Sequence, residues 1–299
     1  MQKKQFDLHL HTYYSDGKES PLSVLKMVKK AGLSLVSLTD HNSLSHILEA
    51  KKIAGRLRLN LISGIELSCI YQNKHLHLLG YAFDAKDGEL KKVVHKIQAR
   101  RKKGILKIAK KLRDLGFDIQ NKELAALPAE YYGLAHIIRI LQKKPRENRR
   151  ILNEVGSSDI YAIINHYFAE AKEAYVPEDY LPAVKMIKLI RASGGFVSIA
   201  HPGSHLSYPE DGIIASLKAC GLEAIEVFTP KHNWDQVVHY EMLAKKLKLT
   251  VTAGSNYHED FHQQDIPIVT PLGFLKTPPE VLDNLLDFLK KRTGYKLLY

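Results

Sequence analysis

Residues 6–11 read Phe6-Asp7-Leu8-His9-Leu10-His11, and Ser15-Asp16-Gly17 follows in a turn. Alternation of apolar and polar residues is typical of a β-strand, in which alternate side chains lie on one face. His9 and His11 therefore project together, with the Asp16 carboxylate close behind. Two imidazoles and a carboxylate suit zinc, manganese or iron. A half-buried strand with chance polar positions explains the His-x-His pattern about equally well, so the rest of the chain has to decide.

The composition is that of an ordinary globular protein. Of 299 residues, 45% are hydrophobic and 25% charged, which is enough for a sizeable core. The sequence has no run of about 18 apolar residues and no leader before the first strand. Cys69 and Cys220 are the only cysteines, so neither a disulfide framework nor a cysteine zinc knuckle is indicated. We expect a cytoplasmic protein that does not enter a membrane.

The chain is strongly basic, with a net charge of +12. Such a charge favours anionic partners such as phosphate esters, nucleotides or RNA. A lysine-rich composition that only keeps the protein in solution explains the charge equally well, because charge alone specifies no site.

Strands and helices alternate in the first and last parts of the chain. The expected helices cover 21–31, 43–56, 182–193 and 278–292, and the expected strands are 6–11, 35–39, 59–65, 75–83, 196–200, 224–228 and 249–253. This rhythm favours an α/β fold of parallel βα units, with functional groups at the C-terminal strand ends. Residues 87–175 show helical periodicity instead. We therefore expect a barrel domain of residues 1–86 and 176–299, interrupted by an inserted helical subdomain of residues 87–175.

Polar side chains able to bind a cation recur at the predicted strand ends. They are His9, His11, Asp16, Asp40, His41, Glu66, His77, His201, Asn256 and His258. As core residues each would need its own buried partner, which is costly to repeat so often, so the set predicts a metal site. The other histidines lack this placement and are expected in loops or at the surface. They include His46, His75, His95, His205, His232, His239 and His262.

These motifs resemble the PHP (polymerase and histidinol phosphatase) family of metal-dependent phosphoesterases. The resemblance rests on segments 7–11, 15–17, 38–41, 64–68, 75–81, 199–203 and 254–258. The helical insertion is similar to the branch of nucleoside bisphosphate and 5′-nucleotide phosphatases, some of which also trim RNA from its 5′ end. The implied fold is a distorted seven-stranded (βα) barrel with an inserted α-helical subdomain.

The resemblance also implies two or three divalent metal ions, of manganese, zinc or iron. His9 and His11 would hold the first, and Glu66 would bridge it to the second. His77 and a histidine of the insertion, for which His136 is the candidate, would complete the second. Asp16, His41 and His258 would hold the third.

Other residues receive supporting roles. His201 is interpreted as a phosphate contact or a proton donor to the leaving oxygen, and Asp40 as a group that orients His41 or a water molecule. Arg139 and Lys172 are further candidate phosphate contacts, although each is more simply explained as a solvated or structural charge.

The last motif departs from the family pattern. It usually reads Gly-Ser-Asp-aromatic-His, but residue 256 is Asn256. An amide oxygen is a neutral and weaker donor, so the first metal should be held less tightly. A natural variant with altered metal use, an engineered substitution and a degenerate site all remain open.

The resemblance implies hydrolysis of a phosphate monoester by a metal-activated water. The substrate would be a nucleoside 3′,5′-bisphosphate, a 5′-nucleotide or the 5′ end of short RNA. One alternative is a catalytically weakened metal- or nucleotide-binding protein, which Asn256 and the basic insertion favour; another is a histidinol-phosphatase-like enzyme. The insertion is basic, with the run Arg100-Arg101-Lys102-Lys103; it either binds RNA or, more simply, caps the barrel mouth. Oligomeric state is beyond the sequence.

Overall fold

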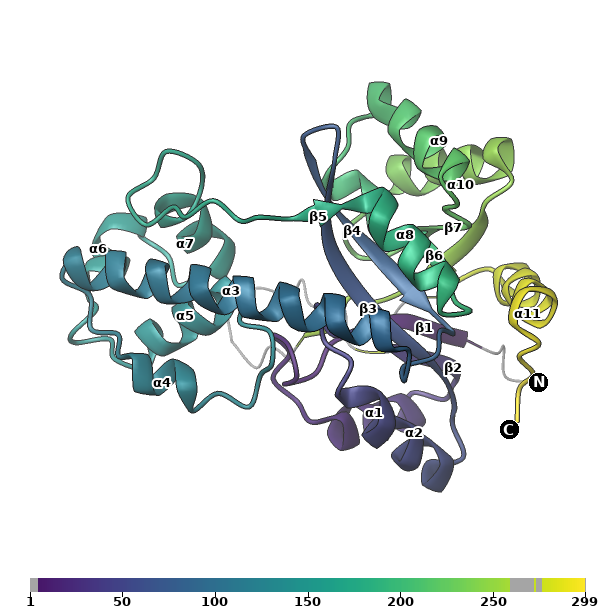
Figure 1. The fold of residues 1–299 in the computed structure, drawn as a ribbon, viewed down its shortest axis with the longest axis horizontal. Coiled ribbons are helices and arrows are strands. Elements are labelled where there is room, and N and C mark those ends of the chain that lie inside the picture. Colours follow the sequence, from purple (N-terminus) through teal and green to yellow (C-terminus); the bar gives the residue numbers. More distant parts are fainter. Residues whose placement is uncertain (1–4, 259–271, 273–275, 299) are drawn as a thin grey trace. The chain divides into compact units, whose positions relative to one another are not determined.

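The computed structural model describes residues 5–258, 272 and 276–298. The chain divides into two compact units, Met1–Val94 with Tyr180–Tyr299, and His95–Asp179. The first unit is an α/β unit with one sheet, and the second is helical. The long helix α3 (Gly88–Asp114) begins in the first unit and continues into the second (Figure 1).

Seven strands of the first unit follow one path through the sheet. In path order they are β1 (Gln5–Leu10), β2 (Leu33–Leu38), β3 (Asn60–Tyr71), β4 (Lys74–Tyr81), β6 (Phe196–Ile199), β7 (Ala224–Phe228) and β8 (Thr250–Ala253). Pairing is parallel except on the two sides of β4. The predicted α/β fold is confirmed, and each predicted strand has a counterpart. The two-residue strand β5 (Leu181–Pro182), which pairs with β3, has none in the prediction.

The prediction that the strands belong to parallel βα units is wrong for β4, which runs antiparallel to β3. The reason is local. Gln72 and Asn73 have φ values of 47° and 61°, the left-handed pair of a two-residue hairpin turn. The hairpin extends β3 to Tyr71, six residues beyond the predicted end, and Glu66 therefore lies inside a strand.

The chain after β8 returns to β1. Leu10 forms a parallel bridge with Tyr257, and the His11 N–H donates to the Tyr257 carbonyl at 2.9 Å. The end of β1 thus lies beside the turn that follows β8. Gly254 makes this approach possible, because a Cβ atom there would lie 2.1 Å from the His9 Cβ.

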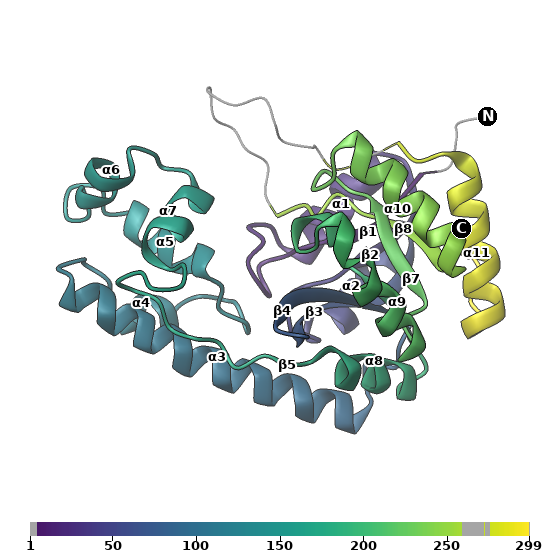
Figure 2. The same ribbon diagram turned by 90° about the horizontal axis from the view of Figure 1, so that it is seen from above.

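Helices cover the outside of the sheet. Helix α1 (Pro21–Lys30) packs on β2 and α2 (His46–Leu57) packs on β2 and β3, while α8 (Ala183–Ala192) packs on β3, β4 and β6. Helix α10 (Trp234–Leu247) packs on β7 and contacts α9 (Asp211–Ala219), and α11 (Pro279–Thr293) packs on β8 and β1 (Figure 2). Their apolar faces are buried, which leaves the strand ends as the place for polar side chains.

The second unit has its own apolar core. Helices α4 (Asn121–Ala125), α5 (Leu134–Gln142), α6 (Arg150–Val155) and α7 (Ile160–Tyr167) follow α3. Ile105, Leu112, Phe117, Ile138 and Tyr167 are among the buried residues of this core. That the helical residues are an insertion stays a prediction.

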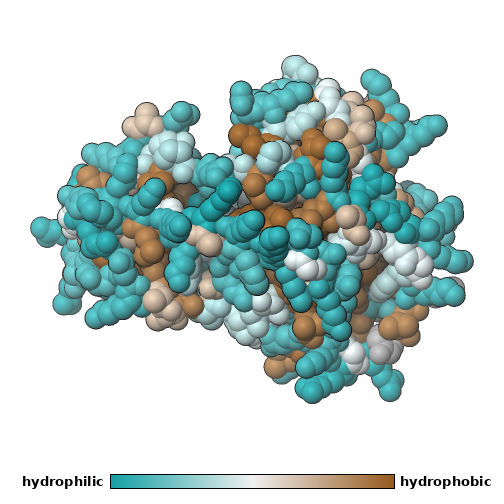
Figure 3. Space-filling model, in the orientation of Figure 1, coloured by the Kyte–Doolittle hydropathy of each residue, from teal (hydrophilic) through white to brown (hydrophobic). Residues whose placement is uncertain are grey.

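One side of α3 is exposed and basic. Hydrophilic residues cover this helix in Figure 3, and the exposed residues Lys96, Arg100, Lys103, Lys107 and Lys110 recur at helical spacing. No helix in the described part of the chain is long and apolar enough to span a membrane.

Candidate metal centre

Strand β1 delivers two imidazoles to one place. Leu8 and Leu10 are fully buried in the core, and the alternation places His9 and His11 together on the other face. Their ring centroids lie 5.1 Å apart, and both side chains are fully buried. Strand geometry therefore confirms that these two histidines project together.

Glu66 lies at the centre of the histidine side chains. It is buried, and its backbone in β3 forms a parallel bridge with His41 beyond the end of β2. Five imidazole nitrogens surround its carboxylate. The Oε2 atom lies 3.1 Å from His9 Nε2, 3.2 Å from His11 Nε2 and 3.2 Å from His41 Nδ1, and Oε1 lies 2.9 Å from His77 Nδ1 and 3.2 Å from His201 Nε2.

Hydrogen bonds alone do not account for this arrangement. The buried Nε2 of His11 and Nδ1 of His77 approach Glu66 without the direction that a hydrogen bond requires. A carboxylate offers about four lone-pair positions, fewer than the nitrogens that converge on it. Imidazole lone pairs and carboxylate oxygens are the donor set of zinc, manganese and iron sites. These residues therefore fit divalent metal ions on either side of Glu66.

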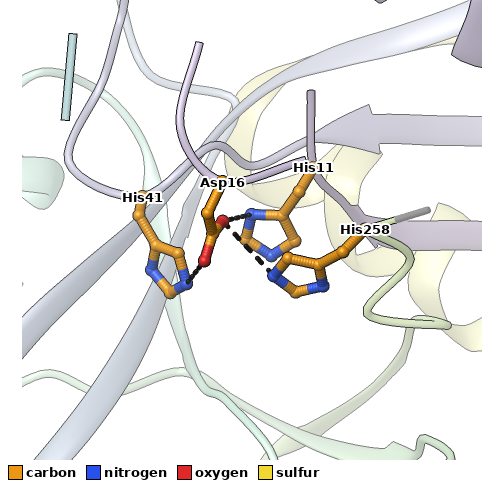
Figure 4. Close-up of side chains that lie close together, drawn as sticks. All are labelled: His11, Asp16, His41 and His258. Carbon is orange, nitrogen blue, oxygen red and sulfur yellow. Dashed lines mark ion pairs between the residues drawn. The ribbon is translucent and has the colours of Figure 1, made fainter. Parts of the chain in front are cut away.

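A second group of ligand atoms surrounds Asp16. Its Oδ1 lies 3.3 Å from His258 Nε2 and 3.8 Å from His11 Nδ1, and its Oδ2 lies 3.9 Å from His41 Nε2 (Figure 4). The four potential ligand atoms all lie within 4.8 Å of one another. The distances to His11 and His41 exceed hydrogen-bond length, so direct hydrogen bonds do not explain this grouping. The close mutual spacing of the four atoms fits the ligands of one cation.

Glu226 is a functional candidate that sequence reasoning missed. This buried residue lies on β7, where its Oε1 accepts a hydrogen bond from His9 Nδ1 at 2.9 Å and its Oε2 accepts the His201 backbone N–H at 2.8 Å. The signal was present, since a carboxylate within the apolar run Ala224–Phe228 is rare without a partner. By holding Nδ1 of His9, Glu226 leaves Nε2 facing Glu66.

Asp40 positions the turn that carries Asp16. Its carboxylate accepts hydrogen bonds from the Thr12 N–H (2.7 Å), the Thr12 hydroxyl (2.6 Å) and the Ser15 hydroxyl (2.7 Å). His46 Nδ1 lies 3.2 Å from the same carboxylate. The expectation that His46 is a loop or surface residue is wrong, because it begins α2 and is 1% exposed.

His205 and His75 also lie at the site, against the sequence expectation. The ligand atoms of His77, His201 and His205 all lie within 4.8 Å of one another. The ring of His75 stacks on Tyr180, with centroids 4.2 Å apart, and meets the ring of His77 edge-on at 4.9 Å. Sequence reasoning missed His75 because it assumed a parallel β4, whereas the antiparallel β4 begins at the site end of the sheet. It missed His205 because this residue follows a turn rather than a strand.

Two further histidines have structural partners. His232, expected in a loop or at the surface, is buried; its Nδ1 donates to the Val227 carbonyl at 2.8 Å, and its Nε2 accepts the Gly203 N–H at 3.0 Å. His239 Nε2 lies 2.9 Å from Asp211 Oδ1. His95 is exposed, as expected. His262 lies outside the described residues.

The side-chain oxygen of Asn256 is a potential metal ligand that lacks a hydrogen bond within the described part of the chain. Its φ is 51°, in the left-handed region, and its carbonyl accepts a hydrogen bond from His258 Nδ1 at 2.8 Å. Its side-chain Oδ1 is buried and makes no hydrogen bond to any described residue. Such an atom costs free energy unless something else satisfies it.

Protonation follows from burial and from the neighbouring charges. Burial, with the charge of His258, lowers the pKa of His11 to about 4, and burial lowers the pKa of His41 to about 3. Burial would raise the pKa values of Glu66 and Asp16, but the surrounding imidazoles hold both well below the usual range. The carboxylates are therefore ionised at neutral pH, and His11 and His41 keep a lone pair.

His9 behaves differently. Burial alone would lower its pKa, but the carboxylates of Glu226 and Glu66 raise it to about 10. A metal ion at Nε2 would therefore have to displace a proton from the His9 imidazole.

A family model described as the PHP domain matches residues 7–208. The chain belongs to the PHP family of metal-dependent phosphoesterases. The matched segment contains most of β1, all of β2 to β6, and every candidate ligand except Asn256 and His258; Glu226 also lies outside it.

Known relatives align with most of the length of this PHP chain. A 5′-3′ exoribonuclease of Haemophilus influenzae is 28% identical over 85% of this chain and 90% of its own length. A 3′,5′-nucleoside bisphosphate phosphatase of Chromobacterium violaceum is 23% identical over 87% and 92%. A crystal structure from Bifidobacterium adolescentis, described as a predicted metal-dependent phosphoesterase, has a TM-score of 0.76 at 21% identity and covers 96% of each chain. That likeness supports the fold.

Three predicted site residues lie in the helical unit. His136 is buried near the start of α5, where its Nδ1 accepts the Gly133 N–H at 3.0 Å. Arg139 is half-buried in the same helix, and Lys172 is exposed. None of the potential metal-binding groups among the described residues includes His136. The roles of these residues stay predictions.

Proposed function

We propose that this PHP protein hydrolyses a phosphate monoester of a nucleotide, a nucleoside 3′,5′-bisphosphate or a 5′-nucleotide, or the 5′ phosphate of a short RNA. The observation that carries the proposal is the buried Glu66 carboxylate with five imidazole nitrogens within 3.2 Å. Such a shared carboxylate suits two adjacent metal positions, and the Asp16 group suits a third.

The three positions have the following ligands in this proposal. The first takes His9, His11, Glu66 and the amide oxygen of Asn256; the second takes Glu66, His77 and His201; the third takes Asp16, His41 and His258. The distance of 3.2 Å from His201 Nε2 to Glu66 favours a ligand role over that of a proton donor. His201 thus replaces His136 as the candidate for the second position.

Bound divalent cations would neutralise the phosphate oxygens and lower the pKa of a water molecule. Other residues of the chain hold the candidate metal ligands in position. Glu226 holds the His9 ring and the backbone of His201, whose φ of 27° is strained. Asp40 fixes the turn that carries Asp16.

Exposure at the site agrees with a small anionic substrate. The side chains of Asp16 and His77 are each 17% exposed and that of His258 is 27% exposed, whereas those of His9 and His11 are fully buried. A phosphate can therefore approach at the third position and at His77. The exposed basic residues of α3 supply a surface for an RNA backbone.

The cysteines Cys69 and Cys220 are free thiols, in keeping with a cytoplasmic location.

Metal analysis and hydrolysis assays test the proposal. Purified protein reconstituted with manganese or zinc should hold at least two metal ions. It should release phosphate from nucleoside 3′,5′-bisphosphates, 5′-nucleotides or 5′-phosphorylated short RNA. Glu66→Gln should abolish both properties, while Glu223→Gln, whose carboxylate pairs with Arg292 away from the site, is the matched control. Fewer than two metal ions would overturn the multinuclear site.

A catalytically weakened metal- or nucleotide-binding protein is the second candidate, and the amide at Asn256 is the observation that favours it. Asn256→Asp separates the two. Phosphate release by the wild type supports the enzyme, and release by the variant alone shows that Asn256 is the lesion. If both are inactive on nucleotides and short RNA but still bind metal, the binding function is correct.

A further inference from the structure

The second metal position has an additional imidazole next to it. His205 lies after the short 3-10 turn Pro202–Ser204, and its ligand atom lies within 4.8 Å of those of His77 and His201. Its ring centroid is 5.1 Å from that of His77 and 5.2 Å from that of His201. None of the motif segments by which the chain resembles its family includes His205.

The turn before His205 is fixed rather than loose. The Gly203 N–H donates to His232 Nε2 at 3.0 Å, and the Gly203 carbonyl accepts a hydrogen bond from Gln236 Nε2 at 3.0 Å. The His205 N–H donates to the Pro202 carbonyl at 2.9 Å. A turn held by His232 and by Gln236 of α10 keeps the His205 imidazole at one place.

One ring nitrogen of His205, Nε2, is buried and lacks a hydrogen bond to any described residue, and Nδ1 of His201 is in the same condition. The ring of His75 lies beside the ring of His205, with centroids 5.7 Å apart. A buried polar atom without a partner costs about 1–3 kcal/mol, and a cation shared with the neighbouring imidazoles would remove that cost.

We propose that His205 is a third imidazole ligand for the metal ion that His77 and His201 hold, and that it biases this position toward zinc. The inference rests on the proposed function, since it assumes that this position holds a metal. Imidazole nitrogen suits zinc, whereas manganese prefers carboxylate, carbonyl and water oxygens. A position with three imidazoles and one carboxylate oxygen, from Glu66, should therefore discriminate between the two ions.

Metal affinity tests this directly, with His239→Gln as the matched control for His205→Gln. Wild type and both variants are titrated with zinc and with manganese against a competing chelator. The visible spectrum of the cobalt-loaded proteins reports the ligand set. His205→Gln should weaken one zinc ion about tenfold or more, leave manganese affinity nearly unchanged and alter the cobalt spectrum. His239→Gln should match the wild type. His205→Cys, which restores a donor atom, should recover zinc binding.

Equal zinc affinity and an unchanged cobalt spectrum in His205→Gln would overturn the proposal. If that variant does not fold, wild-type crystals loaded with zinc decide the question through an anomalous-scattering map. A zinc ion about 2.0–2.1 Å from His205 Nε2 supports the ligand role, and one beyond about 3 Å overturns it. Failure of the proposed hydrolysis appears differently, as an absence of phosphate release with every metal.

Discussion

The proposed first and third metal positions are built from neighbouring residues but differ in charge and exposure. His11 belongs to the first, and its Nδ1 lies 3.8 Å from Asp16 Oδ1 of the third. The turn after β8 supplies Asn256 to the first and His258 to the third. The third has its own carboxylate, Asp16, whose side chain is 17% exposed. The first is closed off, with His9 fully buried, and depends on the shared Glu66 because residue 256 offers an amide.

The difference indicates which metal position should bind its ion more weakly. Ion binding in a buried place depends on ligand charge, because water cannot compensate for a missing anion. The first position should thus be the weaker of the two despite its better shielding. The third, being partly exposed, should exchange ions and substrate with solvent.

Asp16→Asn should have the largest effect. It removes the carboxylate of the third position, so one metal ion per chain should be lost and phosphate release should fall about a hundredfold or more. Metal analysis and the hydrolysis rate measure the two effects. Asp211→Asn, which faces His239 away from the site, should change neither. Retention of every metal ion by Asp16→Asn would contradict the assignment.

Gly254→Ala should disturb the first position through packing. A Cβ atom at residue 254 would lie 2.1 Å from the His9 Cβ and 2.9 Å from Glu226 Oε1, so the turn after β8 has to move. We expect a loss of about 1–3 kcal/mol in the free energy of unfolding and weaker metal binding. Denaturant unfolding measures the loss. In Gly212→Ala no atom lies within 4 Å of the added Cβ, so this variant should be nearly neutral.

Asn256→Asp should make the first position resemble the third. The variant adds an anionic donor where the Asn256 Oδ1 is buried without a hydrogen bond. Because metal affinity rises with ligand charge, the weakest metal ion should bind about tenfold more tightly. A chelator competition measures this gain. Unchanged affinity would show that residue 256 does not contact a metal.

Ser20→Ala should affect neither metal position and is the prediction with the smallest expected effect. Ser20 caps α1 by accepting the Ser23 N–H at 3.0 Å. Loss of such a cap costs about 1 kcal/mol of stability, which thermal unfolding would detect. Metal content and hydrolysis should equal those of the wild type. A change in either would link α1 to the site.

The sequence alone determined the strands, the α/β class and most of the histidines and carboxylates that converge. It could do so because strand periodicity fixes which side chains share a face, and because buried charges are rare without a purpose. His9, His11, Asp16, His41, Glu66 and His77 were all identified from strand ends and family motifs.

Only the tertiary structure decided which groups share a position. The turn at Gln72 and Asn73 reverses β4, and this brings His75 beside the site and places Glu66 within a strand rather than at its end. Glu226 and His205 come from a strand and a turn far along the chain, and no local pattern records that they meet His9 and His77. Convergence of distant segments depends on the pairing order of the sheet, which sequence periodicity does not encode.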